Sequence, residues 1–279
     1  MNVLEFSGLL LLSSTSAGLL GAMTGLGGGT VLVPLLTLAF GVDIRYAIGA
    51  ALISVIATSS GAAAAYVKEG FTNIRVGMFL ELATTTGAIA GAAAAAHAPV
   101  HALSIMFGVV LFLSSVFSAK PQATKILPDR PDRLATFLKM DSTYPTAEGK
   151  QPYHVHNVAG GASLMFVAGI LSGLLGIGSG ALKVIAMDKL MRMPFKVSTT
   201  TSNLMIGVTA AASSGVYLSR GYIDPGLVMP VTLGVLGGSV VGARMLTAAQ
   251  PKVLKVLFNL LILLMACQMI YNGIRGTAG

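Results

Sequence analysis

The feature that most constrains this chain is a glycine motif that occurs twice inside long apolar sequence. It reads GLGGG at residues 25–29 and GIGSG at residues 176–180. Glycine interrupts a helix, and a helix that restarts after the interruption points unpaired backbone N–H groups at whatever lies in front of it. Such a helix start attracts anions. The sequence therefore predicts two anion-attracting breaks within apolar helices.

Composition places those breaks in a membrane. The chain has 279 residues, of which 54% are hydrophobic and 10% are charged. This is too little polar surface for a soluble globule, and the apolar runs reach the ~20 residues that cross a bilayer. We predict an all-α polytopic membrane protein. The net charge of +8 does not indicate nucleic acid, because the basic residues lie mostly in short loops beside apolar segments.

The two halves of the chain are internal repeats. Over about seventy residues they align without gaps at an offset of 151, so that Gly18 matches Gly169, Tyr66 matches Tyr217 and Gly87 matches Gly238. We predict a first transmembrane repeat at 1–119, a loop at 120–157 and a second repeat at 158–279. The predicted apolar segments are 5–24, 29–40, 46–67, 76–96 and 102–119, then 158–175, 180–191, 197–218, 226–247 and 256–274.

The short segments after the glycines decide the predicted topology. Twelve helical residues span about 18 Å, less than the hydrocarbon core. If each motif turns the chain back, as a re-entrant hairpin or as two crossings, thirteen basic residues face the inner side and three the outer side, with Lys183 and Arg244 set aside as intramembrane. If each motif merely interrupts one helix, the tally is ten against six. The positive-inside rule prefers the first arrangement, which predicts two inverted repeats, each with a glycine-broken helical hairpin and three transmembrane helices.

The loop at 120–157 is rich in proline and charge, so we expect it outside the membrane on the cytoplasmic side. Alternation of polar and apolar residues at 137–144 and 153–158 favours a small hairpin. His154 and His156 share one face of such a strand, and solvated side chains are the preferred interpretation over a metal site. The single cysteine, Cys267, excludes an internal disulfide and a cysteine metal site. No metal and no cofactor are expected.

A run of hydroxyl side chains begins the helix expected at 197–218. It reads STTTSN at residues 198–203, whereas the matching stretch of the first half is AIGAAL. Neutral hydroxyl and amide donors bind an oxyanion without the full charge of a cation. Helix capping and interhelical hydrogen bonds are the alternative use of these residues. We favour anion binding and expect a chemically asymmetric site.

Two charged residues lie inside the predicted membrane segments. Lys183 follows Gly180 by three residues, where a buried ammonium opposes the helix dipole and needs either an anion or a route to water. Glu81 is the carboxylate well inside a predicted span, and an intramembrane acid is a candidate for proton coupling. Capping a neighbouring helix at an interface is the preferred alternative for Glu81.

These residues resemble a known family. GLGGGTVLVPLL in the first half, and AGILSGLLGIGSG, ALKVIAMDKLM and MPFKVSTTTSN in the second, are similar to the sulfite exporter TauE/SafE family, the TSUP permeases. The chain departs from the pattern at Ser179, where members commonly have a third glycine, and at Ile185, where they commonly have a proline. We therefore expect the second short helix to be less firmly kinked than the first.

The resemblance implies a transporter, with export as the expected direction, for small sulfur-containing anions such as sulfite and organosulfonates. It implies a multi-pass protein of the inner (plasma) membrane whose partners are the small anionic substrate and the lipid bilayer, without nucleic acid and with the oligomeric state left open. The predicted substrate site comprises Gly25, Gly27, Gly28, Gly29, Gly176, Gly178, Ser179, Gly180, Lys183, Thr199, Thr200, Thr201, Ser202 and Asn203, with Glu81 as coupling candidate.

Three other functions compete with this one. A channel-like facilitator for the same anions needs no coupling residue, so a pH gradient would separate it from a coupled carrier. An intramembrane enzyme is disfavoured because the predicted spans contain no cluster of His, Glu and Asp and no Ser/His pair. A membrane scaffold does not explain two costly helix interruptions at matching positions, although glycines also serve close helix packing.

Overall fold

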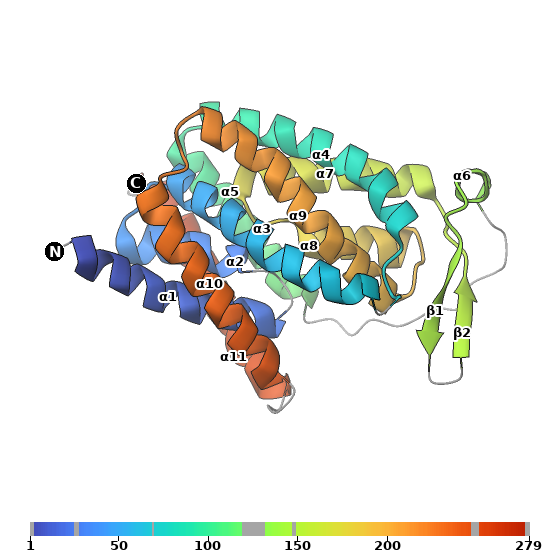
Figure 1. The fold of residues 1–279 in the computed structure, drawn as a ribbon. Coiled ribbons are helices and arrows are strands. Elements are labelled where there is room, and N and C mark those ends of the chain that lie inside the picture. The colour runs from blue at the N-terminus through green and yellow to red at the C-terminus, as the bar shows by residue number, and fades with distance from the viewer. Residues whose placement is uncertain are drawn as a thin grey trace.

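The protein is a bundle of apolar helices with one small hairpin at its edge. The structure is a computed structural model that describes residues 3–24, 28–68, 70–118, 132–146, 149–246 and 251–276. Figure 1 shows the hairpin and the short helix α6 (Arg133–Phe137) beyond one end of the bundle, while the chain termini lie toward the other end. The prediction of an all-α architecture is confirmed.

Each half of the chain contributes the same series of elements. In the first half these are α1 (Val3–Thr24), α2 (Gly29–Pro34), the π-helical turn η1 (Leu35–Ala39), α3 (Ile44–Lys68), α4 (Ile74–His97) and α5 (Val100–Ser118). In the second half they are α7 (Val158–Leu175), α8 (Gly180–Ile185), the π-helical turn η2 (Ala186–Leu190), α9 (Phe195–Ser219), α10 (Pro225–Leu246) and α11 (Pro251–Arg275). Each lies within a few residues of an apolar segment predicted from the sequence.

Helices of one half pack on helices of the other. The main pairs are α1 with α10, α4 with α7, α3 with α9, and α5 with α11. At the 151-residue offset, α1 corresponds to α7, α4 to α10, α3 to α9 and α5 to α11. The pair α1 with α10 therefore corresponds to the pair α7 with α4, and the other two pairs correspond to themselves. The packing therefore has the pattern of a two-fold relation between the halves.

Close-packed glycines fix two of these helix pairs. A Cβ added at Gly18 would clash with the Val235 carbonyl oxygen, and one added at the matching Gly169 would clash with the Thr84 carbonyl oxygen. Thr84 and Val235 are themselves separated by the repeat offset. These glycines let the backbones touch, which is how small residues stabilise helix pairs in membranes.

The pair α5 and α11 runs antiparallel. A Cβ at Gly108 would meet Ile270, whereas one at Gly273 would meet Ile105, so residue numbers rise along one helix as they fall along the other.

Both glycine motifs turn the chain back. After η1, the Phe40 ring lies 5.9 Å from the ring of Phe6, near the start of α1. After η2, the Met191 carbonyl oxygen accepts a hydrogen bond from the His156 N–H, just before α7, at 3.0 Å. Each short helical arm thus returns to the end at which the preceding helix began.

The expected difference in kink between the two short arms is wrong at the level of backbone conformation. Pro34 lies inside α2, and Ile185 replaces it in α8. Nevertheless both helices run directly into a π-helical turn of five residues. In the second half this turn is closed by a bond of 2.9 Å from the Met191 N–H to the Ala186 carbonyl, so a proline is not required for it.

The outer faces of the bundle are apolar. On α4, Met78 is 64% exposed and Leu82 is 70% exposed, and their counterparts on α10, Met229 and Leu233, are 64% and 59% exposed. Among the described residues, α4 and α7 pass a length-and-hydropathy test for a membrane span, and five further helices are apolar over shorter stretches. Large apolar side chains on the outside of a bundle are expected where lipid replaces water.

The loop between the halves contains an antiparallel hairpin that docks on the bundle. Strands β1 (Ser142–Thr146) and β2 (Gly149–Tyr153) pair directly, within the loop where the alternation predicted a hairpin but closer to its turn. The Asn73 side-chain amide, in the loop before α4, donates to the Met140 carbonyl at 2.8 Å and to the Tyr153 hydroxyl at 2.7 Å. Burial raises the pKa of that tyrosine.

Candidate substrate cavity between the two glycine motifs

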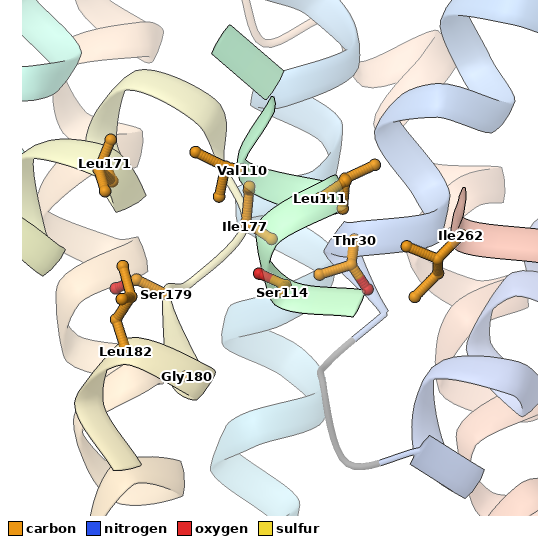
Figure 2. Close-up of a pocket in the computed structure, with 10 residues that line it drawn as sticks. All are labelled: Thr30, Val110, Leu111, Ser114, Leu171, Ile177, Ser179, Gly180, Leu182 and Ile262. Atoms are coloured by element: carbon orange, nitrogen blue, oxygen red, sulfur yellow. The ribbon is translucent and has the colours of Figure 1, made fainter. Parts of the chain in front are cut away.

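A small cavity lies where the two halves meet at their glycine motifs (Figure 2). Its volume is about 30 Å³. Thr30, at the start of α2, faces it from the first half, and Ser179 and Gly180 face it from the second. The rest of the lining comes from α5, α7, α8, α11 and the second motif: Val110, Leu111, Ser114, Leu171, Ile177, Leu182 and Ile262. The cavity is mostly apolar with three hydroxyl groups.

The second motif has an unusual backbone because three of its residues adopt positive φ angles. These are Gly176 at 67°, Gly178 at 71° and Ser179 at 45°. A serine there is strained where a glycine is not. Its hydroxyl oxygen is buried and has no hydrogen-bond partner among the described residues. The hydroxyl of a strained serine on the cavity wall is therefore open to a ligand.

The first motif is described from Gly28 onward, and Gly25 and Gly27 lie outside the described residues. Gly28 has φ −60°, an ordinary helical value, and precedes α2. A Cβ at Gly29 would lie 2.9 Å from the Gly176 carbonyl oxygen, so the two motifs touch. A Cβ at Gly180 would lie 2.8 Å from the Ile206 side chain. Close packing is thus one physical reason for glycine in both motifs.

The hydroxyl run lies next to the cavity at one residue only. The Ser202 hydroxyl donates to the Gly180 carbonyl oxygen at 3.3 Å. Thr199 donates to the carbonyl oxygen of Phe195 in its own helix, and Thr200 donates to the carbonyl oxygen of Phe71 at 3.1 Å. The Thr201 hydroxyl accepts a hydrogen bond from the Asn73 N–H at 3.0 Å. Asn203 is half-buried. In this conformation the run ties α9 to the loop before α4.

Lys183 does not reach the surface. Its side chain is fully buried, and the Nζ atom donates to the Thr209 hydroxyl at 2.5 Å. Because Lys183 lies one helical turn after Gly180, the same short helix carries both a cavity wall and a buried ammonium. The structure thus shows no snorkelling of this residue.

Glu81 is brought to the same place from the other half. Its Oε1 atom accepts from the Thr209 hydroxyl at 2.6 Å and from the Thr85 hydroxyl at 3.0 Å. The Glu81 side chain is only 7% exposed, which excludes a surface cap. The sequence predicts a role for Glu81 and Lys183 but not for Thr209, whose match with Thr58 at the 151-residue offset is the signal that marks it.

Metal binding has no support within the part of the chain that the structure describes. There, no group of three or more His, Cys, Asp or Glu side chains could hold a metal ion. His154 instead contacts the Asp141 carboxylate, with 3.0 Å between Nδ1 and Oδ2. This pair lies beside the hairpin, in the loop outside the bundle.

Comparison with known proteins agrees with the architecture. Residues 10–269 match the family described as "Sulfite exporter TauE/SafE". A "Probable membrane transporter protein YunE" of Bacillus subtilis (strain 168) is 28% identical over 275 residues, 95% of this chain and 98% of the relative. A second protein of that strain, "Probable membrane transporter protein YdhB", is 28% identical over 88% of this chain and 92% of its own length. No solved structure matches the chain.

A match that spans nearly the whole chain, including both glycine motifs, assigns the protein as a whole. The two relatives are named as probable membrane transporters, and this chain matches almost their full lengths. The protein is accordingly a polytopic α-helical membrane transporter rather than an enzyme, and it belongs to the sulfite exporter TauE/SafE family.

Proposed function

We propose that the protein transports small sulfur-containing anions, sulfite or organosulfonates, and binds them in the cavity between the two glycine motifs. The observation that carries this proposal is the Ser179 hydroxyl, which is buried at the cavity, has no partner among the described residues, and stands beside the start of α8. A hydroxyl and backbone N–H groups at a helix start suit an anion with several oxygens. The family description supports the substrate class and suggests export as the direction.

The cavity is closed in this conformation. Its volume of about 30 Å³ corresponds to about two water molecules, because one water needs roughly 10–15 Å³ of such space. A sulfonate group is larger, so binding requires the motifs to move apart. The contact between Gly29 and the Gly176 carbonyl is the tight point that has to open.

The arrangement of helices supports two inverted repeats. Repeat counterparts α5 and α11 run antiparallel, so their two-fold axis crosses the bundle and would lie in the membrane plane. With the hairpin loop on the cytoplasmic side of the inner membrane, the positive-inside rule is satisfied. Rocking of one repeat against the other would then expose the cavity to each side in turn.

A transport assay tests the proposal. Purified protein in proteoliposomes should take up radiolabelled sulfite, and unlabelled organosulfonates such as methanesulfonate should compete, whereas acetate should not.

Ser179→Gly removes the hydroxyl without straining the backbone, and Gly28 is its counterpart in the first half. We expect the affinity of this variant for sulfite to fall by about fivefold, because the lost hydrogen bond contributes ~1 kcal/mol. The control Ser163→Ala removes an exposed hydroxyl on α7. Uptake that sulfonates do not inhibit would overturn the proposed substrate class.

A further inference from the structure

The hydrogen bonds around Thr209 can be satisfied in two ways. Its one hydroxyl proton has two acceptors within reach, Glu81 Oε1 at 2.6 Å and the Met205 carbonyl oxygen at 2.9 Å. If Glu81 is ionised, Thr209 donates to the carboxylate. If Glu81 is protonated, it donates to Thr209, which turns its own proton to Met205. The Thr209 oxygen can accept from Lys183 in both states, because a hydroxyl has two lone pairs.

Only one of the two Glu81 carboxylate oxygens accepts hydrogen bonds within the part of the chain that the structure describes. The second oxygen, Oε2, is buried and has no partner among the described residues. A buried carboxylate oxygen without a donor is costly, and a proton on the group removes much of that cost. The site therefore accommodates the acid as well as the carboxylate.

Among the described residues of α4, α7, α8 and α9, Lys183 is the charged group that shares a hydrogen-bond partner, Thr209, with Glu81. Asp188 and Lys189 lie in the π-helical turn η2 that follows α8. The sequence of α7 contains no titratable residue. On α9, Lys196 stacks on the Phe71 ring near one end, and the Tyr217 hydroxyl donates to the Gly173 carbonyl near the other. On α4 itself, Arg75 and His97 lie at the two ends. The charge of Lys183 is thus the one that Glu81 balances.

The matching place in the other half of the protein is neutral. At the repeat offset, Lys183 corresponds to Leu32, Thr209 to Thr58 and Glu81 to Thr232. Leu32 is fully buried, and the Thr232 hydroxyl lies 3.3 Å from that of Ser54. The matching helix contact therefore forms without charged residues. The acid and the ammonium exist in one copy, which points to a role beyond folding.

We propose that Glu81 carries a proton through the transport cycle and that Lys183, released by that proton, binds the transported anion, so that the protein is a proton–anion symporter. The inference rests on the proposed function, since it assigns the driving ion of the same cavity. Lys183 follows Gly180, a cavity wall, by one turn, and its stem spans ~6 Å. An anion in the opened cavity can thus replace Glu81 as its counter-charge.

The sign of the coupling follows from charge balance. When Glu81 is ionised, its negative charge balances the Lys183 ammonium through the shared Thr209 hydroxyl. The ammonium then requires no bound anion as counter-charge. When Glu81 is protonated, the ammonium is left buried and unbalanced, so anion affinity rises. By reciprocity, a bound anion raises the proton affinity of Glu81 by the same factor. An inward proton gradient therefore favours anion entry, and export relies on the outward gradient of the anion itself.

Methanesulfonate tests this sign because it carries no group that titrates near neutral pH. Its affinity for the purified wild-type protein should rise as pH falls, by up to tenfold per pH unit if one proton binds with each anion. Infrared difference spectra should show the carbonyl band of a protonated carboxyl group that grows when methanesulfonate is added. That band should be absent in Glu81→Gln and unchanged in the control Glu5→Gln.

Variants separate the two charges. Glu81→Gln imitates the protonated acid, so it should bind methanesulfonate tightly at every pH, while its uptake into vesicles should no longer move protons. Lys183→Met should lose at least tenfold in affinity and all pH dependence. The double variant Glu81→Thr with Lys183→Leu copies the neutral half of the protein, so it should fold and bind weakly at every pH.

The outcomes distinguish this inference from the proposed function. If neither sulfite nor methanesulfonate binds the wild-type protein, the proposed function fails together with its coupling. If both bind but affinity is independent of pH, or the carboxyl band persists in Glu81→Gln, the transporter remains and the proton role of Glu81 is wrong. If Lys183→Met binds normally, the ammonium is not the anion ligand and the symport mechanism is overturned.

Discussion

At the scale of single residues, the described polar side chains of the bundle fall into two groups. Some form hydrogen bonds that hold helices together, and others have polar atoms without a partner among the described residues, which are open to a ligand. Thr200 and Thr201 are satisfied by backbone groups of the loop before α4, whereas Ser179 and the second oxygen of Glu81 have no partner among the described residues. Sequence alone could not make this division, because a hydroxyl in a membrane helix suits either role. It depends on which neighbour the fold brings within about 3 Å.

Thr201→Val separates the two roles in the hydroxyl run. The Thr201 hydroxyl accepts from the buried Asn73 N–H, so its loss should lower the free energy of unfolding by about 1–3 kcal/mol. Thermal unfolding in detergent measures this. If the run instead lines the anion path in an open state, anion affinity should fall by a similar amount while stability is unchanged. Thr199→Val, which removes an exposed hydroxyl bonded within its own helix, is the matched control.

At the scale of elements, hydropathy and the repeat predicted every long helix to within a few residues. Apolar runs bounded by charge, glycine and proline define membrane helices well, because lipid tolerates no unsatisfied backbone. Contacts between helices are harder to predict from the sequence than the helices themselves. The repeat alignment matches Gly169 with Gly18, but the packing of Gly169 against the Thr84 carbonyl depends on α4 and α7 lying side by side. The pairing of Glu81 with Lys183 depends on the same kind of contact, across a hundred residues of sequence.

Glycine substitutions test the helix pairs. Gly169→Ala and its counterpart Gly18→Ala each place a methyl group against a backbone carbonyl of the partner helix, so each should destabilise the protein by about 1–3 kcal/mol. Gly215→Ala, on α9, meets nothing within 4 Å and should instead be neutral or stabilising by up to about 1 kcal/mol. Thermal unfolding of the three variants would contradict the packing scheme if Gly215→Ala were as harmful as Gly169→Ala.

At the scale of the whole molecule, the described ends of the helices gather into two sets. One set, with Asn73, Met140 and Tyr153, lies by the hairpin. The other contains Arg45, whose guanidinium donates to the Ala98 carbonyl and stacks on the Tyr222 ring. Because described basic residues lie near the hairpin, such as Arg75, which donates to the Lys139 carbonyl oxygen, the proposed orientation puts that end in the cytoplasm.

Cysteine labelling tests this orientation. In a Cys267→Ala background, Thr143→Cys lies on the exposed hairpin and Arg220→Cys at the opposite end of the bundle. A membrane-impermeant maleimide should label Arg220→Cys in intact cells and Thr143→Cys only after the cells are opened. The reverse pattern would mean that the protein is inserted the other way round.

Uptake by proteoliposomes of a variant with a filled cavity tests the central claim, that anions pass between the two glycine motifs. Ser114 lines the cavity from α5, and Ser114→Leu fills a space of about 30 Å³, whereas Leu113→Met alters a lipid-facing neighbour. We predict that Ser114→Leu folds but takes up radiolabelled sulfite no faster than empty vesicles, and that Leu113→Met behaves like the wild type. Sulfite uptake at the wild-type rate by folded Ser114→Leu would contradict the account, because the anion would then cross elsewhere.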